Sequence, residues 1–494
     1  MGVAGTDRSD QVLQGYGYEQ EFGRTIRRFA SFAIGFSFIS ITTGIFTTYG
    51  FVLANSGPLG IWTWPLVIVG QTFVALVFGA LAARMPLAGY TYQWASRLAN
   101  PKLGWLLGWF SFAFLIVDVV AVDYAVASTV LPALFNATWG TGQVWIACAL
   151  VILLQAALIA ASTLWTARVN SIAVGTEVVG ILGLVILLVI VGLVTGSLHP
   201  DHVFSTGTVS SQGWFGLGGL TSDSPFVFAF LLGAFTIVGF EAAANLAEET
   251  RDSENAVPAS MWQAVVISGV IGFLFLLALN LASGDLGALT KSGTPVADIV
   301  TQMLGGAIGR LFLLFVTFSI FACGLVIFLT VVRLVWAMSR DNRFPGHSVF
   351  RQVNTGLRTP VMATLLCFVL IEAVLAIFAN QTSTLFNLFS AATLMPAIIY
   401  LATVLLYVGV RKRLPASRGF SLGSWEWPVI IISLVWLVWE LSIFRDASFK
   451  LPWLYVLVMV GIGLIYFAWL LIARPATLQT TGSASEREIE PSRL

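Results

Sequence analysis

Six acidic residues fall inside long apolar stretches of the sequence, and they are the first candidates for chemistry. They are Asp118, Asp123, Glu177, Glu241, Glu372 and Glu440. An acidic side chain at the centre of a membrane helix costs about 2.5 to 3.5 kcal/mol on insertion scales, so each should face a partner or a polar cavity. None of the stretches carries an obvious central Lys or Arg to neutralise them. Carboxyl groups buried without a cation tend to hold a proton, which is the property that a proton-coupled carrier needs.

Position within the stretches makes Glu177 and Glu241 the leading coupling residues. Glu177 stands about seven residues into its apolar stretch, and Glu241 adjoins an interruption in another. Asp118 and Asp123, five residues apart on one helix, point about 140° from each other, so at most one of them readily faces the centre. Glu440 lies near the outer end of its stretch, and we expect its side chain to reach the membrane surface.

Two of the apolar stretches are interrupted near mid-depth, and three further stretches separate them. The first interruption is Thr42-Thr43-Gly44-Ile45-Phe46, and the second runs from Phe235 to Glu241. Hydrocarbon offers no water to unpaired backbone groups, so unwound backbone at that depth persists only where it lines a polar cavity or binds something. The pair of interruptions therefore predicts a substrate site.

The two breaks predict complementary contacts. Free backbone N–H groups at the positive end of the first half-helix suit a substrate carboxylate. Carbonyl groups at the second break suit an ammonium group, and Gly239 relaxes the backbone there. The alternative is that Gly44 and Gly239 only let helices pack closely. The predicted binding residues are Thr42, Thr43, Gly44, Ile45, Phe46, Phe235, Thr236, Val238, Gly239 and Phe240.

Membrane-spanning helices are the elements that must hold these residues. The chain of 494 residues is 57% hydrophobic and only 10% charged, and its mean hydropathy is +0.89. Soluble domains carry roughly 25% charged residues, so the composition predicts an all-α integral membrane protein. About twelve stretches are long enough to cross a core that needs roughly 20 helical residues. They are 29–54, 61–83, 104–135, 143–162, 170–196, 225–247, 259–282, 310–339, 360–379, 384–410, 427–444 and 452–473.

The order of the spans predicts two copies of one five-helix unit. Because five is odd, the second copy must sit upside down in the membrane, which brings the breaks in spans 1 and 6 to the same depth. The expected architecture is a five-plus-five inverted-repeat (LeuT-like) fold with discontinuous helices 1 and 6 and two extra C-terminal helices. Its segments are a cytosolic tail (1–28), the first repeat (29–196), an extracellular loop (197–224), the second repeat (225–410), helices 11 and 12 (411–474) and a disordered cytosolic tail (475–494).

Basic residues predict the orientation of the chain. Of the 25 Lys and Arg, all fall in the two tails and alternate loops except Lys291, Arg310, Arg445 and Lys450. Positive residues stay on the cytoplasmic side, so we expect a multi-pass plasma membrane protein with both termini cytosolic.

Other chemistries are not favoured by the sequence. Cys148, Cys323 and Cys367 lie inside predicted spans without metal-ligand spacing and are read as small apolar fillers. The three His residues lie in loops, where we expect them to be solvated. The sequence shows no metal-ligand cluster and no nucleophile with a nearby base, so it gives no indication of an enzyme. No cofactor is expected. The net charge of +1 gives no sign of a nucleic-acid partner.

Four short motifs, in the right order and spacing, resemble the amino acid–polyamine–organocation superfamily. They are Thr43-Gly44-Ile45-Phe46, Met85 to Tyr92, Gly239-Phe240-Glu241 followed by Ala247 to Thr250 and Pro258, and Arg333 to Pro345. The opening Gly17 to Phe22 with Arg24 is similar to the amino acid/choline branch, which includes GABA and choline permeases. The resemblance covers about residues 18–474. It implies a twelve-helix permease, proton-coupled or exchanging, that binds its substrate at the unwound parts of spans 1 and 6.

Two departures from the superfamily pattern concern the candidate site. Relatives commonly have Gly where Thr42 stands, and some bacterial carriers of cationic amino acids have a lysine, thought to replace a sodium ion, where Glu177 stands. Glu177 is therefore expected to carry the coupled proton or, when ionised, to help bind Na⁺ or a cationic substrate. The segment beginning Asp123-Tyr124 is similar to an acid–Tyr segment of those relatives, which favours Asp123 over Asp118 as a structural or gating residue. Asp123 therefore joins Glu177 and Glu241 as a candidate coupling residue.

The sequence thus predicts a secondary active transporter for an amino acid or a related small amine. H⁺ is the expected coupling ion and Na⁺ the alternative. A carrier of choline, ethanolamine or polyamines is the second possibility, and a quaternary amine would need aromatic faces such as Phe46, Phe235, Phe240 or Tyr124. A transporter-like sensor or a membrane enzyme is the remote alternative.

Overall fold

The structure, a computed structural model, describes residues 22, 24–211, 214, 224–378, 384–414, 417, 419–445 and 449–479. Three predictions fall partly or wholly outside these residues. They concern the motif at residues 17–21, residues 212–223 of the extracellular loop apart from Trp214, and the tail beyond residue 479.

The described residues are helical, with no strand and one isolated bridge between Ile26 and Thr250. A π-helical turn, Val126–Val130, joins α6 to α7. The helices are α2 (Arg28–Ile39), α3 (Ile41–Ser56), α4 (Thr63–Ala82), α5 (Tyr90–Leu98), α6 (Pro101–Ala125), α7 (Leu131–Phe135), α8 (Thr141–Ala161), α9 (Thr163–Thr195), α10 (Pro225–Thr236), α11 (Ala242–Asn245), α12 (Ser253–Ala282), α13 (Leu286–Leu289), α14 (Pro295–Leu304), α15 (Gly306–Arg340), α16 (His347–Phe350), α17 (Val361–Phe378), α18 (Thr384–Val410), α19 (Glu426–Ile443) and α20 (Lys450–Ala473).

The predicted membrane-spanning class is confirmed. Among the described residues, 11 helical segments are long and apolar enough to cross a membrane, and α10 is a shorter apolar helix at the start of the predicted span 225–247. Spans 1 and 6 are both interrupted, since α2 gives way to α3 and α10 ends well before α12 begins. The division into two inverted repeats, with the boundaries given above, stays a prediction.

Local sequence sets where several spans begin. The side chain of Asn100 accepts a hydrogen bond from the backbone N–H of Lys102 at the start of α6. In α10, Ser224 accepts from the N–H of Val227, and Pro225 occupies the first turn, where its missing N–H leaves nothing unpaired. Ser224 and Pro225 fix where α10 begins. Because the helix is 12 residues long, they also set the depth at which it ends.

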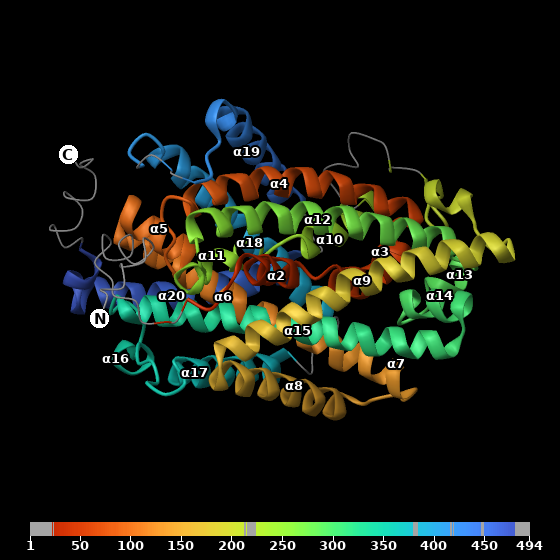
Figure 1. Cartoon of the computed structure of the whole chain (residues 1–494), viewed down its shortest axis with the longest axis horizontal. Helices are drawn as coiled ribbons and strands as arrows, with labels where there is room; N and C mark the ends of the chain where they lie inside the picture. Colours follow the sequence, from red (N-terminus) through yellow and green to blue (C-terminus); the bar gives the residue numbers. More distant parts are fainter. Residues whose placement is uncertain are drawn as a thin grey trace, which may run out of the picture.

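The broken helices lie inside the bundle. In Figure 1, α2, α3 and α10 lie between α4 and α12 on one side and α15 on the other. Helix α3 packs against α10, and α2 packs against α9, α12 and α15. By contrast, α8, α9 and α20 carry exposed apolar side chains, including Leu154, Val179 and Ile465. Those faces suit hydrocarbon, so the breaks are shielded from lipid by the surrounding helices.

The two ends of the bundle differ in the elements that they carry. One end carries α5 and α16, and we call it the α5 end; the opposite end carries α7, α13 and α14, and we call it the α13 end (Figure 1). The basic loops of the sequence analysis lie at the α5 end, which includes Arg84, Arg340 and Arg343. The charge pattern therefore predicts that the α5 end is cytosolic.

Candidate substrate site at two helix breaks

The first break lies at Ser40, two residues before the predicted position. Helix α2 ends at Ile39 and α3 begins at Ile41, while Ser40 itself has φ of +36° and ψ of 90°. A positive φ is unusual for a residue with a side chain. Thr42 to Phe46 are thus helical residues in the first turns of α3, and the interruption is a single residue.

The backbone donors that follow this break are already bonded to the protein. The N–H of Thr42 donates to Oε1 of Glu177 at 2.9 Å, and the N–H of Thr43 donates to the hydroxyl of Ser40 at 3.3 Å. The N–H of Gly44 donates to the carbonyl of Ser40 at 3.0 Å. Free N–H groups were predicted at Thr42, Thr43, Gly44 and Ile45. For the first three the prediction is wrong in this structure, because a side chain from α9 and the residue at the break itself supply the acceptors.

Glu177 reaches the first break from the middle of α9. Its Oε1 accepts from the Thr42 N–H and also from the hydroxyl of Ser40 at 3.2 Å. The Ser40 hydroxyl is in turn 2.6 Å from that of Thr43. Glu177 is 1% exposed, so a carboxyl group stands in the interior at the positive end of a 16-residue helix.

The second break leaves acceptors without partners. Helix α10 ends at Thr236, and Gly239 has φ of +78°, a conformation that suits glycine. The N–H of Gly239 donates to the hydroxyl of Tyr400 at 2.9 Å, so it cannot bond to the carbonyl of Phe235 four residues earlier. No hydrogen bond from a described residue reaches the backbone carbonyl groups of Phe235, Thr236 or Val238.

A small cavity lies between the two breaks and contains one carboxylate. Asp118 of α6 is 2% exposed and lines this cavity. No described residue forms a hydrogen bond with it. The described lining residues include no Lys and no Arg; they are Phe38, Ile39, Thr43, Gly44, Asp118, Val122, Phe235, Val238, Cys323 and Ile327.

The predicted binding residues separate into two groups. Thr43, Gly44, Phe235 and Val238 line the small cavity. The others lie around it without lining it. Thr42 bonds to Glu177, Ile45 is fully buried, the rings of Phe46 and Phe312 are 6.3 Å apart between centroids, Thr236 abuts Gly44, Gly239 bonds to Tyr400, and Phe240 packs against both Phe78 and Tyr400.

Both glycines at the breaks are required by close approach. A Cβ on Gly44 would lie 2.0 Å from the side chain of Thr236, and one on Gly239 would lie 1.8 Å from the ring of Phe38. The glycines therefore allow close helix packing at the same positions where substrate binding was predicted. The contact that excludes a side chain also brings the two breaks together.

The acidic residues considered for coupling have different surroundings. Glu241 accepts a hydrogen bond of 2.7 Å from the hydroxyl of Tyr400 at the second break. Asp123 accepts one of 2.8 Å from the side chain of Gln155 and does not line the cavity. It is Asp118, the acid that the sequence analysis set aside, that faces the breaks. Helical spacing shows only that Asp118 and Asp123 point in different directions, so it could not show which of them faces the breaks.

Glu440 corrects another expectation. It is 1% exposed and its carboxylate lies 3.4 Å from the side-chain nitrogen of Gln71 in α4. It does not reach the surface, because α19 turns this position toward α4.

A larger cavity lies on the α13 side of the breaks. It measures about 220 Å³ and is lined by Thr47, Thr48, Phe51, Leu231, Phe235, Phe389, Ser390 and Thr393. The rings of Phe235 and Phe389 are 4.3 Å apart between centroids. Phe235 lines both cavities.

The α5 end is held by buried ion pairs that the sequence analysis did not find. Arg333 donates to Glu249 at 2.7 Å with both side chains at most 3% exposed, and Arg340 donates to Glu248 at 2.9 Å. The ring of Phe22 lies 4.3 Å from the Arg333 guanidinium. These residues belong to two of the motifs quoted above, and the sequence carries no signal that pairs one motif with the other. These contacts join α15 to the segment that follows α11 at this end of the bundle.

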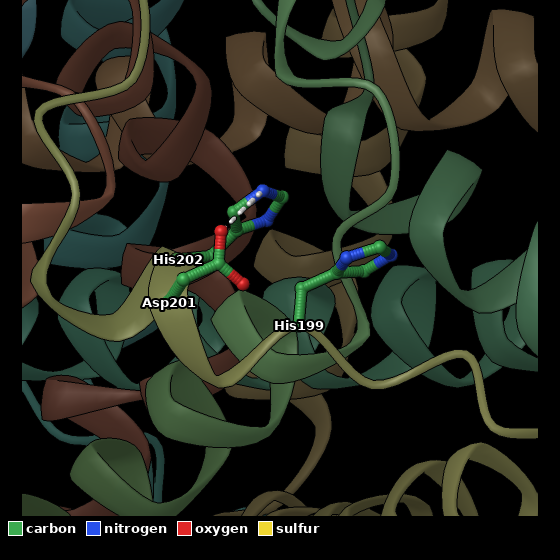
Figure 2. Close-up of side chains that lie close together, drawn as sticks. All are labelled: His199, Asp201 and His202. Atoms are coloured by element: carbon green, nitrogen blue, oxygen red, sulfur yellow. Dashed lines mark ion pairs between the residues drawn. The ribbon is translucent and has the colours of Figure 1, made fainter.

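The loop after α9 carries a histidine cluster at the α13 end. Figure 2 shows the side chain of Asp201 beside those of His199 and His202. Their ligand-type atoms lie within 4.8 Å of one another. His202 is not simply solvated as expected, since its Nδ1 lies 2.8 Å from the hydroxyl of Ser283.

Comparison with known proteins decides what kind of membrane protein this is. A family model described as amino acid permease matches residues 26–474. The chain belongs to the amino acid permease family. This confirms the resemblance to the amino acid–polyamine–organocation superfamily.

Several curated permeases are similar over most of their length. The amino-acid permease BAT1 of Arabidopsis thaliana is 26% identical over 456 residues, which is 87% of each chain. An uncharacterised amino-acid permease of Schizosaccharomyces pombe is 25% identical over 90% of this chain and 82% of its own. The low-affinity putrescine importer PlaP of Escherichia coli is 27% identical over 65% of this chain and 68% of its own.

The family membership settles the broad class of function. The chain is a permease, a multi-pass membrane transporter, and not an enzyme.

Proposed function

We propose that this permease moves a small solute bearing a protonated amine, an amino acid or a related amine, across the plasma membrane by alternating access. The observation that carries the proposal is the cavity between the breaks. It combines the Asp118 carboxylate with the unpartnered carbonyl groups of Phe235 and Val238. Buried acceptors without donors are costly, and an ammonium group supplies donors in several directions.

The same surroundings support proton coupling. Glu177 and Glu241 lie one at each break, and each is at most 3% exposed with no basic partner among its described hydrogen bonds. Carboxyl groups so placed can take up and release a proton as the breaks change their contacts. We propose H⁺ as the coupling ion, with Na⁺ as the alternative, and assign Asp123 a structural role through Gln155.

The state of the structure fits one step of an alternating cycle. The cavity of about 220 Å³ lies on the α13 side of the breaks, while buried ion pairs close the α5 side. With the α5 end and both termini in the cytosol, this arrangement admits solute from outside and blocks its exit inward. The opposite step requires that the ion pairs at the α5 end separate.

Uptake by proteoliposomes tests the proposal. Purified permease is reconstituted at a single internal pH, and uptake of labelled amino acids and amines is measured with an inward proton gradient, an inward sodium gradient or no gradient. We expect saturable uptake of at least one amine-bearing solute, raised by the proton gradient. Uptake equal to that of protein-free vesicles for every solute would overturn the proposal, and stimulation by sodium alone would replace H⁺ with Na⁺.

A further inference from the structure

We propose that the cargo is an amine or another organic cation that lacks a carboxylate, because Glu177 takes the place that a cargo carboxylate would occupy. This inference rests on the proposed function and narrows its substrate class. It comes from an asymmetry between the breaks: three successive backbone donors of one are used by the protein, and three backbone acceptors of the other are not.

Three backbone N–H groups at the first break already have acceptors within the protein. A cargo carboxylate would bind the N–H groups that open α3, where the positive end of the helix favours an anion. Those of Thr42, Thr43 and Gly44 donate to Glu177, the Ser40 hydroxyl and the Ser40 carbonyl. A carboxylate arriving here would have to break these bonds, because the donors left without a partner among the described residues, the Ile41 N–H and the Thr42 hydroxyl, belong to fully buried residues that do not line the cavity.

Glu177 fills this position in either protonation state. Ionised, it is the anion that the helix end favours; protonated, its carbonyl oxygen still accepts from Thr42, and its bulk still occupies the site. Its second contact, with the Ser40 hydroxyl at 3.2 Å, fixes it against the residue at the break. The site is therefore closed to a second carboxylate by space as well as by bonding.

The unpartnered groups that line the small cavity are acceptors. They are the Asp118 carboxylate and the backbone carbonyl groups of Phe235 and Val238, none of which has a hydrogen-bond partner among the described residues. Asp118 is 2% exposed and lines the cavity, and the ring of Phe235 adds an aromatic face. Such a set binds a cation, and nothing in it recognises an anion.

The charge around the breaks points the same way. Asp118, Glu177 and Glu241 lie near them, and the described residues that line the two cavities include no Lys and no Arg. A zwitterion would bring one more negative charge into a region of low dielectric constant that already holds several carboxyl groups. A cargo without a carboxylate avoids this repulsion and keeps the attraction to Asp118.

Matched pairs of solutes test the inference. Each pair differs by one carboxylate: putrescine and ornithine, cadaverine and lysine, ethanolamine and serine, and tyramine and tyrosine. Unlabelled members compete for uptake of the best labelled solute by reconstituted permease. We expect the amine to compete at least ten-fold better than its amino acid in every pair that competes at all. Equal competition, or preference for the amino acid, would overturn the inference.

Two substitutions locate the cause of the preference. Glu177→Ala removes the carboxyl group and vacates the end of α3, so the preference for the amine should fall several-fold. Glu177→Gln keeps an acceptor for the Thr42 N–H, so the preference should persist. A preference unchanged in Glu177→Ala would show that Glu177 is not its source and would overturn the inference. If Glu177→Ala does not fold, Asp118→Asn takes its place, and a uniform loss of amine competition is then the supporting result.

The inference and the proposed function fail differently. Uptake of amino acids without uptake of amines would end the inference and leave the proposed function standing. No uptake of any member of any pair would end both.

Discussion

The hydroxyl of Tyr400 donates a hydrogen bond of 2.7 Å to the carboxylate of Glu241, and the same oxygen accepts one of 2.9 Å from the N–H of Gly239. One side chain of α18 thus satisfies a backbone donor and a carboxylate on the two sides of the second break. The break is therefore held open by a tertiary contact and not by local sequence alone.

Replacing Tyr400 with Phe tests this contact. The change would leave the Gly239 N–H and the Glu241 carboxylate without their partner, which costs about 1 to 3 kcal/mol for a buried group. We expect a lower melting temperature and reduced uptake. Tyr407→Phe is the matched control, because the Tyr407 hydroxyl bonds to Glu426 away from the breaks. Uptake of Tyr400→Phe equal to that of the control would contradict the role given to this contact.

Replacing Gly44 with Ala tests the approach of α3 to α10. The added Cβ would lie 2.0 Å from Thr236, so one of the two helices must move. We expect most uptake to be lost. Gly175→Ala on α9 is the control, since nothing lies within 4 Å of its Cβ position, and alanine there favours the helix by roughly 0.5 to 1 kcal/mol. Full uptake by Gly44→Ala would show that the close contact is dispensable.

Replacing Glu249 with Gln tests the closure at the α5 end. Removing one partner of a buried ion pair leaves an uncompensated charge and costs about 3 to 5 kcal/mol. We expect thermal unfolding at a clearly lower temperature. The control is Glu426→Gln, whose carboxylate is 3.9 Å from Arg411 and 31% exposed, and such pairs contribute about 0 to 1 kcal/mol. Similar melting temperatures for the two variants would mean that the Arg333–Glu249 pair adds little.

Replacing Glu241 with Gln tests its proposed part in coupling. Gln keeps the shape of the side chain but cannot exchange a proton, so uptake should lose its response to an inward proton gradient while binding of solute persists. Uptake is measured at one outer pH with two inner pH values. Glu440→Gln is the control, a buried acid bonded to Gln71 outside both cavities. A gradient response that survives in Glu241→Gln would remove this residue from the coupling path.

Much of the fold follows from the sequence because its signals are local. A span such as 143–162 is read from a continuous apolar run, and the structure places α8 at Thr141–Ala161. The second break is likewise local, since Gly239 adopts the positive φ that a glycine allows. The break at Ser40 was expected two residues later, because nothing in the sequence favours a positive φ at a serine.

The contacts that define the site are not local, and the sequence could not supply them. Glu177 and Thr42 are 135 positions apart, so the loss of the free N–H groups depends on how α9 packs. The same holds for Arg333 and Glu249, and for the choice between Asp118 and Asp123, which depends on the rotation of α6. The sequence placed each of these residues in a candidate site or in a motif, but it could not predict which residue each one contacts.

Phe235 lines both cavities, whereas on the opposite side of the breaks two buried ion pairs join α15 to the segment after α11. Side chains rotate in picoseconds to nanoseconds where they have room, and helices shift collectively in microseconds to milliseconds. We therefore expect entry from the α13 side to need smaller movements than passage through the α5 end. Passage through the α5 end, which needs both ion pairs to separate, should set the turnover number.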